Sequence, residues 1–237
     1  MNEAVKNPSG CQVGAQPYNM KLRIFLDTAD AAQIRDAVST GLVDGVATNP
    51  NKIAQAGKSY RHVLREIRAV FNGPVAFQAL GRTAEELIAH ALEIHRMDPL
   101  LAVKVTANRV GLSSIRQLVD EGVRTNATLI FNPTQALLAG LAGSPFISPF
   151  IARACMTGSN GIQAIERMRQ LFDRMGIVRT NIIGASIKDV EQVIEVLLAG
   201  AHSVAVPFSV FAAMMEHPLT DAGLEAFMRD RAKTPQD

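Results

Sequence analysis

The sequence predicts a closed (β/α)8 barrel, a TIM barrel built as a single domain with one extra helix at its C-terminal end. Short apolar segments of strand type alternate eight times with amphipathic helical segments between residues 22 and 220. Gly41, Gly122, Gly143 and Gly200 stand where four of these helices should end. No Gly-rich phosphate-binding motif follows the first strand, as it would in a doubly wound open sheet. These observations favour the barrel.

The eight expected strands are apolar runs over residues 23–27, 43–49, 75–80, 100–106, 125–130, 146–151, 182–186 and 203–207. The eight expected helices are amphipathic and cover residues 30–39, 60–71, 83–97, 110–121, 134–142, 162–175, 190–198 and 210–216. Thr83, followed three residues later by Glu86, is typical of a capping box at a helix start. A further helix over 221–231 lies outside the eight pairs. Phe227 and Met228 on it indicate that it docks on another surface.

The expected organisation is a disordered leader over residues 1–21, the barrel over 22–220, and a C-terminal helix and tail over 221–237. The leader is rich in Asn, Gly, Pro and Gln and lacks the apolar core of a signal peptide, so a vector-derived remnant is the alternative. No apolar run approaches the roughly 18 residues that a membrane span needs. We therefore expect a cytoplasmic protein that does not bind membranes.

Composition argues against several function classes. The net charge is +2 and the 24 basic residues are scattered along the chain, which does not predict binding to nucleic acid. The two cysteines, Cys11 and Cys155, form neither a disulfide framework nor a metal site. The five histidines lack metal-ligand spacing, so we expect no metal and no other cofactor.

Lys104 interrupts the apolar segment Leu100–Thr106, and lysine is seldom buried without a reason. A desolvated amine loses its proton more easily and can form a Schiff base with a carbonyl substrate. At a pKa near 10.4 only about 0.04% of the amine is neutral at pH 7, whereas a pKa of about 7.5 would make roughly a quarter of it neutral. A lysine that reaches out from the strand end, or pairs with a carboxylate, is the alternative.

Active sites of such barrels lie at the carboxyl ends of the strands. The polar residues expected there are Asp27, Thr48, Asn49, Gln78, Lys104, Thr128, Arg153, Ser186 and Lys188. One carboxylate, one amine, neutral hydrogen-bonding groups and a late basic cluster suit carbonyl chemistry on a phosphorylated compound. Ser186 with Arg153 or Lys188 could bind the phosphate, because late strands supply that site in many barrels.

Most of these residues also have a purely structural interpretation. Asp27 could cap the helix that follows it, and the segment around Asn49 has the composition of a turn. Gln78 could be a hydrogen-bonded polar residue inside the barrel. Arg153 and Lys188 could be ordinary solvated charges. Residue types and spacing alone leave these alternatives open.

Several segments, one per strand and in chain order, resemble the signatures of the transaldolase family. They are Leu26-Asp27-Thr28, Ala47-Thr48-Asn49-Pro50, Val103-Lys104-Val105, Thr128-Leu129-Ile130-Phe131, Ser148-Pro149-Phe150 with Arg153, and Ala185-Ser186. The resemblance covers residues 22 to about 220. The chain has the length of the short members, which include the fructose-6-phosphate aldolases.

The chain departs from the family pattern around the expected substrate mouth. Thr106 stands where Pro is usual, and Asn51 where Ser is usual. Asn132-Pro133 replaces Ser-Leu-Glu, and residues 154–156 replace an acidic stretch. None of these positions is the amine, so the departures bear on the choice of sugar and not on the type of reaction.

The resemblance implies a catalytic role for Lys104, Asp27, Gln78 and Thr128. Lys104 would be the Schiff-base lysine, and Asp27 an acid/base group working on the substrate hydroxyl. Asn49 and Thr128 would hold substrate hydroxyls or the catalytic water. Gln78 occupies a place where long transaldolases carry Glu and short aldolases carry Gln.

The resemblance also implies a set of substrate-binding residues. Arg153 and Ser186 would bind the phosphate with Lys188 nearby, and Thr48 belongs to the substrate-binding segment of the second strand. Phe150 stands where transaldolases carry Phe and fructose-6-phosphate aldolases carry Tyr.

The expected activity is therefore transfer of a dihydroxyacetone unit from a ketose phosphate to an aldehyde acceptor. An aldolase that releases free dihydroxyacetone is the alternative within the same chemistry. A barrel that only binds sugar phosphates is the alternative of another class, and the presence of Asp27 and Lys104 argues against it. In short members of the family the C-terminal helix packs on a neighbouring subunit, so a homo-oligomer, commonly a pentamer or a decamer, is expected.

Overall fold

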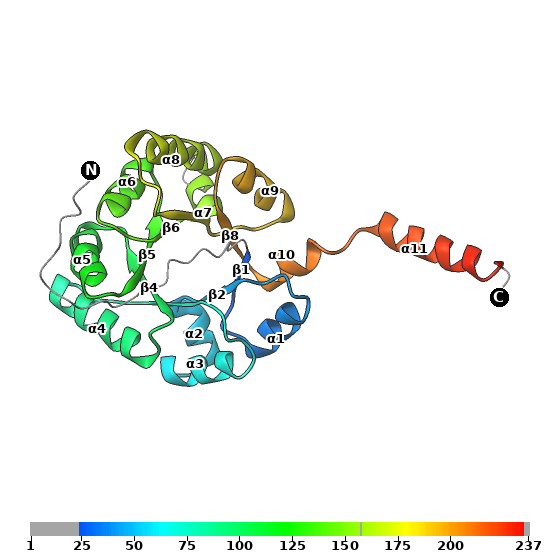
Figure 1. Cartoon of the computed structure of the whole chain (residues 1–237), viewed down its shortest axis with the longest axis horizontal. Coiled ribbons are helices and arrows are strands. Elements are labelled where there is room, and N and C mark those ends of the chain that lie inside the picture. Colours follow the sequence, from blue (N-terminus) through cyan, green and yellow to red (C-terminus); the bar gives the residue numbers. More distant parts are fainter. Residues whose placement is uncertain (1–23, 157, 235–237) are drawn as a thin grey trace, which may run out of the picture.

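A computed structural model describes residues 24–156 and 158–234, so the expected leader over residues 1–21 lies outside the described residues. Eight parallel strands close into a barrel in chain order, with β8 pairing back to β1 (Figure 1). The predicted (β/α)8 barrel is confirmed. The strands are β1 Ile24–Asp27, β2 Gly45–Ala47, β3 Val75–Gln78, β4 Leu101–Thr106, β5 Arg124–Ile130, β6 Phe146–Pro149, β7 Asn181–Gly184 and β8 Ser203–Val206.

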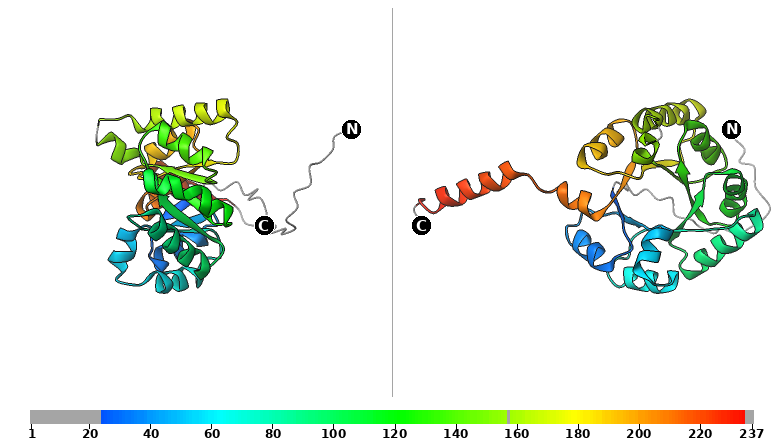
Figure 2. Two further views of the ribbon diagram at one scale, coloured as in Figure 1. Left: turned by 90° about the vertical axis from the view of Figure 1, so that its left-hand side faces the viewer. Right: turned by 180° about the vertical axis from the view of Figure 1, so that it is seen from behind.

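The eight predicted helices surround the barrel, as Figure 1 and the right-hand view of Figure 2 show. They are α1 Ala31–Ser39, α3 Tyr60–Arg68, α4 Ala84–Met97, α5 Arg109–Asp120, α6 Pro133–Leu141, α8 Gly161–Met175, α9 Val190–Leu198 and α10 Phe208–Ala213. The four glycines at helix ends have the left-handed φ that a C-cap requires, between 74° at Gly41 and 100° at Gly200. Thr83 caps α4, but Glu86 accepts its reciprocal bond from the N–H of Arg82, one residue earlier than in a capping box.

Two short helices were not predicted, and both shorten a predicted strand. After β2, Asn49 caps α2 (Pro50–Ala56) and Pro50 occupies its first turn, so the strand predicted to reach residue 49 ends at Ala47. After β6, α7 (Ile151–Cys155) begins two residues beyond the strand. The strand predicted over 146–151 is therefore too long, because Ile151 already belongs to a helix.

The core lies mainly between the outer face of the barrel and the helices, because successive side chains of a strand point to opposite faces. Val46, Phe77 and Val103 belong to this outer layer and are fully buried. The inner faces form a small separate cluster made of Phe25, Ala47, Phe146, Ile183 and Ala205. Gly45 admits the ring of Phe25, since a Cβ at this position would lie 2.4 Å from Cε1 of that ring. Ala76, Ala102 and Ala185 also line the lumen, and their small side chains leave room for a cavity.

The last helix, α11 (Pro218–Arg231), stands away from the barrel in Figure 1. It starts three residues before the predicted helix over 221–231, with Pro218 in its first turn. None of its residues is buried, and Leu219, Leu224, Phe227 and Met228 are 60–75% exposed. The apolar face expected to dock thus has no partner within the described part of the chain. In that part, no helix is long and apolar enough to cross a membrane.

Candidate active site

A cavity of about 300 Å³ occupies the lumen, and all eight strands contribute to its wall. This is the lower end of the size range of small-molecule sites. Its mouth is bordered by α2, α7 and the connection after β7. Seven predicted site residues line it: Asp27, Asn49, Lys104, Phe150, Arg153, Ser186 and Lys188. Thr48, Gln78 and Thr128 do not.

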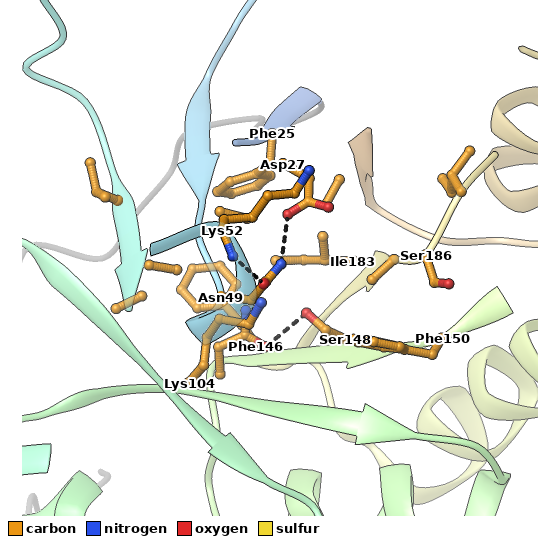
Figure 3. Close-up of a pocket in the computed structure, with 18 of the residues that line it drawn as sticks. Phe25, Asp27, Asn49, Lys52, Lys104, Phe146, Ser148, Phe150, Ile183 and Ser186 are labelled. Carbon is orange, nitrogen blue, oxygen red and sulfur yellow. Dashed lines mark hydrogen bonds between the residues drawn. The ribbon is translucent and has the colours of Figure 1, made fainter. Parts of the chain in front are cut away.

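Lys104 lies near the middle of β4, is 6% exposed, and extends its amine into the cavity (Figure 3). Its Nζ donates a hydrogen bond to the backbone carbonyl of Thr48, 3.2 Å away. Thr48 directly follows β2, which is separated from β4 by β3. Burial lowers the pKa of the Lys104 amine, and the negative charge of Asp27 raises it by a smaller amount. The site therefore favours a neutral, nucleophilic amine with a fixed direction.

Asp27 and Asn49 form a hydrogen-bonded pair beside this amine (Figure 3). Asn49 Nδ2 donates to Asp27 Oδ1 over 3.3 Å, while Asn49 Oδ1 accepts from the backbone N–H of Lys52 at 3.1 Å. Asn49 thus both caps α2 and orients the carboxylate. The capping interpretation is wrong for Asp27, because Asp30 caps α1 and leaves Asp27 in the cavity wall.

Asn126 and Ser148 are cavity residues that the sequence analysis did not select. Asn126 is the register partner of Lys104 on β5, and Ser148 Oγ donates to Asn126 Oδ1 over 2.9 Å. This bond leaves the Asn126 amide nitrogen available as a donor. A signal for both was present, since each is a polar residue at an inward position of a strand. Thr128, the last polar residue of β5, was predicted for the site in place of Asn126, and Ser148 belongs to a motif from which Phe150 was predicted.

The three predicted residues that do not line the cavity are all buried. Gln78 Nε2 donates to the backbone carbonyls of Ala79 and Lys104, both at 3.0 Å, so this side chain braces the strand that carries the amine. Thr48 Oγ1 donates to the carbonyl of Ala76 at 2.8 Å. Thr128 Oγ1 is buried without a hydrogen-bond partner among the described residues. The structural interpretation fits Gln78 and Thr48, whereas Thr128 retains an unused hydroxyl.

The phosphate-site candidates lie together at the mouth. Arg153 is on α7, not at a strand end, and its guanidinium carbon lies 5.1 Å from the ring centre of Phe150. Lys188 is exposed on the neighbouring connection after β7. Ser186 between them has a left-handed φ of 60°, a conformation that a non-glycine residue adopts at a cost of roughly 1–3 kcal/mol and mostly at functional sites.

Within residues 24–156 and 158–234, no group of three or more His, Cys, Asp and Glu side chains is placed to hold a metal ion. Lys104 and Asp27 are the buried amine and the carboxylate that line the cavity. The fold and this site define the class of barrel enzymes of the transaldolase and aldolase type.

The family model described as transaldolase/fructose-6-phosphate aldolase matches residues 24–236 of the chain. A probable transaldolase from Geobacter sp. (strain M21) is 39% identical over 215 residues, which are 91% of this chain and 100% of that protein. A probable transaldolase from Caulobacter vibrioides (strain NA1000 / CB15N) is 41% identical over 91% of this chain and 99% of that protein. The chain belongs to the transaldolase/fructose-6-phosphate aldolase family.

Solved structures with low identity share the fold. A thiamine phosphate pyrophosphorylase from Pyrococcus furiosus superposes with a TM-score of 0.54 at 14% identity, over 81% of this chain and 88% of the other. At this identity the likeness concerns the barrel alone, so the site must be interpreted from its own residues.

Proposed function

We propose that the protein is a Schiff-base transaldolase that transfers a dihydroxyacetone unit from a ketose phosphate to an aldehyde acceptor. The observation that carries this proposal is the buried Lys104 amine, which has a lowered pKa and faces a cavity that also holds Asp27. The names of the relatives support the same activity. A cytoplasmic location is part of the same proposal.

The reaction begins when the neutral Lys104 amine attacks the ketone carbon of the sugar. The carbinolamine then loses water and becomes an iminium ion. A hydroxyl group near the amine would hold this water, and the unpartnered Oγ1 of Thr128 supports such a role. Thr128 lies on β5 two residues beyond Asn126, which is the register partner of Lys104.

Carbon–carbon cleavage follows from the iminium. Asp27 accepts the proton of the hydroxyl group at C4, and the electrons of the C3–C4 bond move toward the iminium nitrogen. An aldehyde leaves and an enamine of three carbons remains on Lys104. Asn49 holds the Asp27 carboxylate in place through its amide. Asn126 and Ser148, on the other side of the amine, would bind hydroxyls of the three-carbon unit.

The phosphate of the sugar would bind between Arg153, Ser186 and Lys188. The two cations match the charge of a phosphate dianion, and neither makes a salt bridge within the described residues. The enamine carbon then attacks the carbonyl carbon of an acceptor aldehyde and forms a new carbon–carbon bond. Water hydrolyses the resulting imine, which completes the transfer.

Borohydride trapping tests the proposal directly. The protein is incubated with a panel of ketose phosphates, reduced, digested and analysed by mass spectrometry. We expect a stable adduct on Lys104 with at least one ketose. A barrel that only binds sugar phosphates would give no adduct with any of them, and an adduct on Lys188 would place the chemistry elsewhere.

Phe150 bears on the choice between transfer and release. Release of free dihydroxyacetone needs a proton donor at the enamine carbon, and such help is worth about 10²–10⁴-fold. The Phe150 ring offers no proton, lines the cavity and packs edge-on against Phe131, with ring centres 6.0 Å apart. Protonation of the enamine should therefore be slow, so the enamine should persist until an acceptor aldehyde binds. Gln78, the residue typical of the aldolases, favours release, but its amide nitrogen is engaged with backbone carbonyls.

Phe150→Tyr should release free dihydroxyacetone at least about tenfold faster than wild type. The measurement compares free dihydroxyacetone formed from a ketose phosphate without acceptor in wild type and variant. Phe131→Tyr is the matched control, because it places a phenol on the neighbouring ring, outside the cavity wall. Should the wild type already release dihydroxyacetone as fast as it transfers it, the aldolase alternative is correct.

The apolar face of α11 supports a homo-oligomer, and the family resemblance suggests a pentamer or decamer. A chain that ends at His217 lacks α11 and should have a lower mass by light scattering at micromolar concentration. Phe227→Lys should weaken the assembly in the same direction, since burying a lysine in an apolar contact is costly. Lys233→Ala is the control, because Lys233 lies beyond α11 and is exposed. A full-length monomer would contradict the proposal.

A further inference from the structure

The backbone of β5 is strained at Leu129. Its φ is 57°, in the left-handed region that a bulky side chain seldom adopts. Among the non-glycine residues that the structure describes, only Ser186 shares a positive φ, and Ser186 is one of the phosphate-site candidates. Such strain persists where the surrounding structure imposes it, and it is concentrated at functional sites. The proposed chemistry assigns no role to Leu129.

The strain belongs to a β-bulge between β5 and β6. Thr128 on β5 pairs with Ser148 on β6. The next pair along the two strands is Ile130 with Pro149. Over this stretch β5 therefore has one residue more than β6, and the extra residue is Leu129. Bulges of this kind redirect the side chains that follow them, often next to active sites.

The bulge changes the face to which the next side chains point. In a regular strand, residues three apart point to opposite faces. Here Ala127 and Ile130 are both fully buried in the core outside the barrel. Since Ile130 points outward, Phe131 after it turns toward the lumen side of the mouth, where its ring meets that of Phe150.

The two residues after the bulge hold Phe150, which lines the cavity. The backbone carbonyl of Ile130 accepts a hydrogen bond from the N–H of Phe150 at 2.9 Å. The ring of Phe131 packs edge-on against the Phe150 ring, with ring centres 6.0 Å apart. The guanidinium carbon of Arg153 lies 5.1 Å from the centre of the same ring. Phe150 is thus held both at its backbone and at its ring.

Phe131 is itself fixed from both sides along the chain. The bulge precedes it, and its backbone N–H donates to Gln135 Oε1 on α6 at 2.9 Å. Gln135 Nε2 in turn donates to the backbone carbonyl of Ala107, directly after β4, at 2.9 Å. Phe131 is 37% exposed and does not line the cavity. Its effect on the reaction therefore has to pass through Phe150.

We infer that the Leu129 bulge and Phe131 are positioning elements, which hold the Phe150 ring in the cavity wall and so keep water from the enamine. This inference rests on the proposed function, in which the enamine on Lys104 is transferred to an acceptor. Release would require the enamine carbon to take a proton, after which one water would hydrolyse the iminium to dihydroxyacetone and the free amine. A Phe150 ring that turns away admits water to that carbon, so its positioning decides the ratio of release to transfer.

The ratio of two rates tests the inference. One is the release of free dihydroxyacetone from a ketose phosphate without acceptor, and the other is product formation with an acceptor aldehyde. Both rates scale with the folded fraction of the protein, so a change of stability alone leaves their ratio unchanged. Phe131→Ala removes the ring that packs on Phe150 and should raise the ratio of release to transfer about tenfold. Phe131→Tyr keeps the ring, so its ratio should equal that of wild type.

Two substitutions of Leu129 separate the backbone conformation from the side chain. Asparagine tolerates the left-handed conformation, so Leu129→Asn should keep the bulge and the wild-type ratio. Valine is β-branched and disfavours this conformation, so Leu129→Val should displace the bulge and raise the ratio. Leu118→Val is the matched control, because Leu118 is fully buried on α5 near the start of β5, at the end of the strand opposite the mouth. It should lower the melting temperature and keep the ratio.

An unchanged ratio in Phe131→Ala would overturn the inference, and so would equal ratios in Leu129→Val and Leu129→Asn. Failure of the proposed function has a different signature, since no protein of the series would then give a borohydride adduct on Lys104. A wild type that forms the adduct and releases dihydroxyacetone as fast as it transfers it would overturn both the inference and the transaldolase proposal.

Discussion

Replacing Lys104 should abolish turnover while leaving the barrel folded. In Lys104→Met the amine is gone and most of the side-chain volume remains, so we expect activity to fall at least about 10⁴-fold, to background. The borohydride adduct should disappear with it. Lys104→Arg should be equally inactive, because a guanidinium stays protonated and cannot form an imine.

The stability of Lys104→Met separates this loss from unfolding. Burial lowers the pKa of the Lys104 amine in the folded state, so below its ordinary pKa the folded protein must either release a proton or bury a charge. This lysine therefore costs stability at neutral pH, and the cost disappears only as the pH rises toward the ordinary value. Methionine removes the cost but leaves the carbonyl of Thr48 without its donor. We expect a melting temperature close to or above that of wild type.

Lys188→Ala is the matched control for Lys104. Lys188 is exposed at the mouth and belongs to the phosphate-site candidates, so its loss should raise KM for a ketose phosphate and leave the adduct on Lys104. If Lys104→Met still forms an adduct, for example on Lys52 or Lys188, the assignment of the nucleophile is wrong.

The barrel and the buried lysine of the fourth strand could be predicted because their signals are local. Eight repeats of an apolar run and an amphipathic helix are visible in the pattern of side chains alone. Lys104 was visible because it is the single cation in an apolar strand. The helices α2 and α7 could not be predicted from the sequence, because segments of 7 and 5 residues are too short to show a helical period.

The fine geometry of the site depends on which way each polar side chain turns. Asn126 and Ser148 point inward from the middle of their strands and bond to each other, whereas Gln78 turns its amide to backbone carbonyls. Asp27 and Asp30 both precede α1, and only the backbone decides that Asp30 caps it. No residue of α11 is buried within the described part of the chain, so the contacts of one chain do not show what its apolar side chains pack against. Such choices are made by tertiary packing, so a linear pattern does not contain them.

Replacing Asp27 should separate imine formation from carbon–carbon cleavage. In Asp27→Asn the amide cannot accept the proton of the C4 hydroxyl, so we expect turnover to fall about 10²–10⁴-fold. The charge of Asp27 raises the pKa of the Lys104 amine, and its removal should lower that pKa further. More of the amine is then neutral at any pH below the pKa. The pH at which borohydride trapping reaches half its maximum should therefore move down, while turnover falls.

The control for this variant is Asp30→Asn, which removes the same charge three residues away. Asparagine caps a helix about as well as aspartate, so α1 should keep its start and the protein its stability. Neither turnover nor the pH profile of trapping should change in it. A merely structural role for Asp27 would reduce trapping and turnover together without moving the pH profile. An upward shift of the trapping profile in Asp27→Asn would contradict the electrostatic coupling between the carboxylate and the amine.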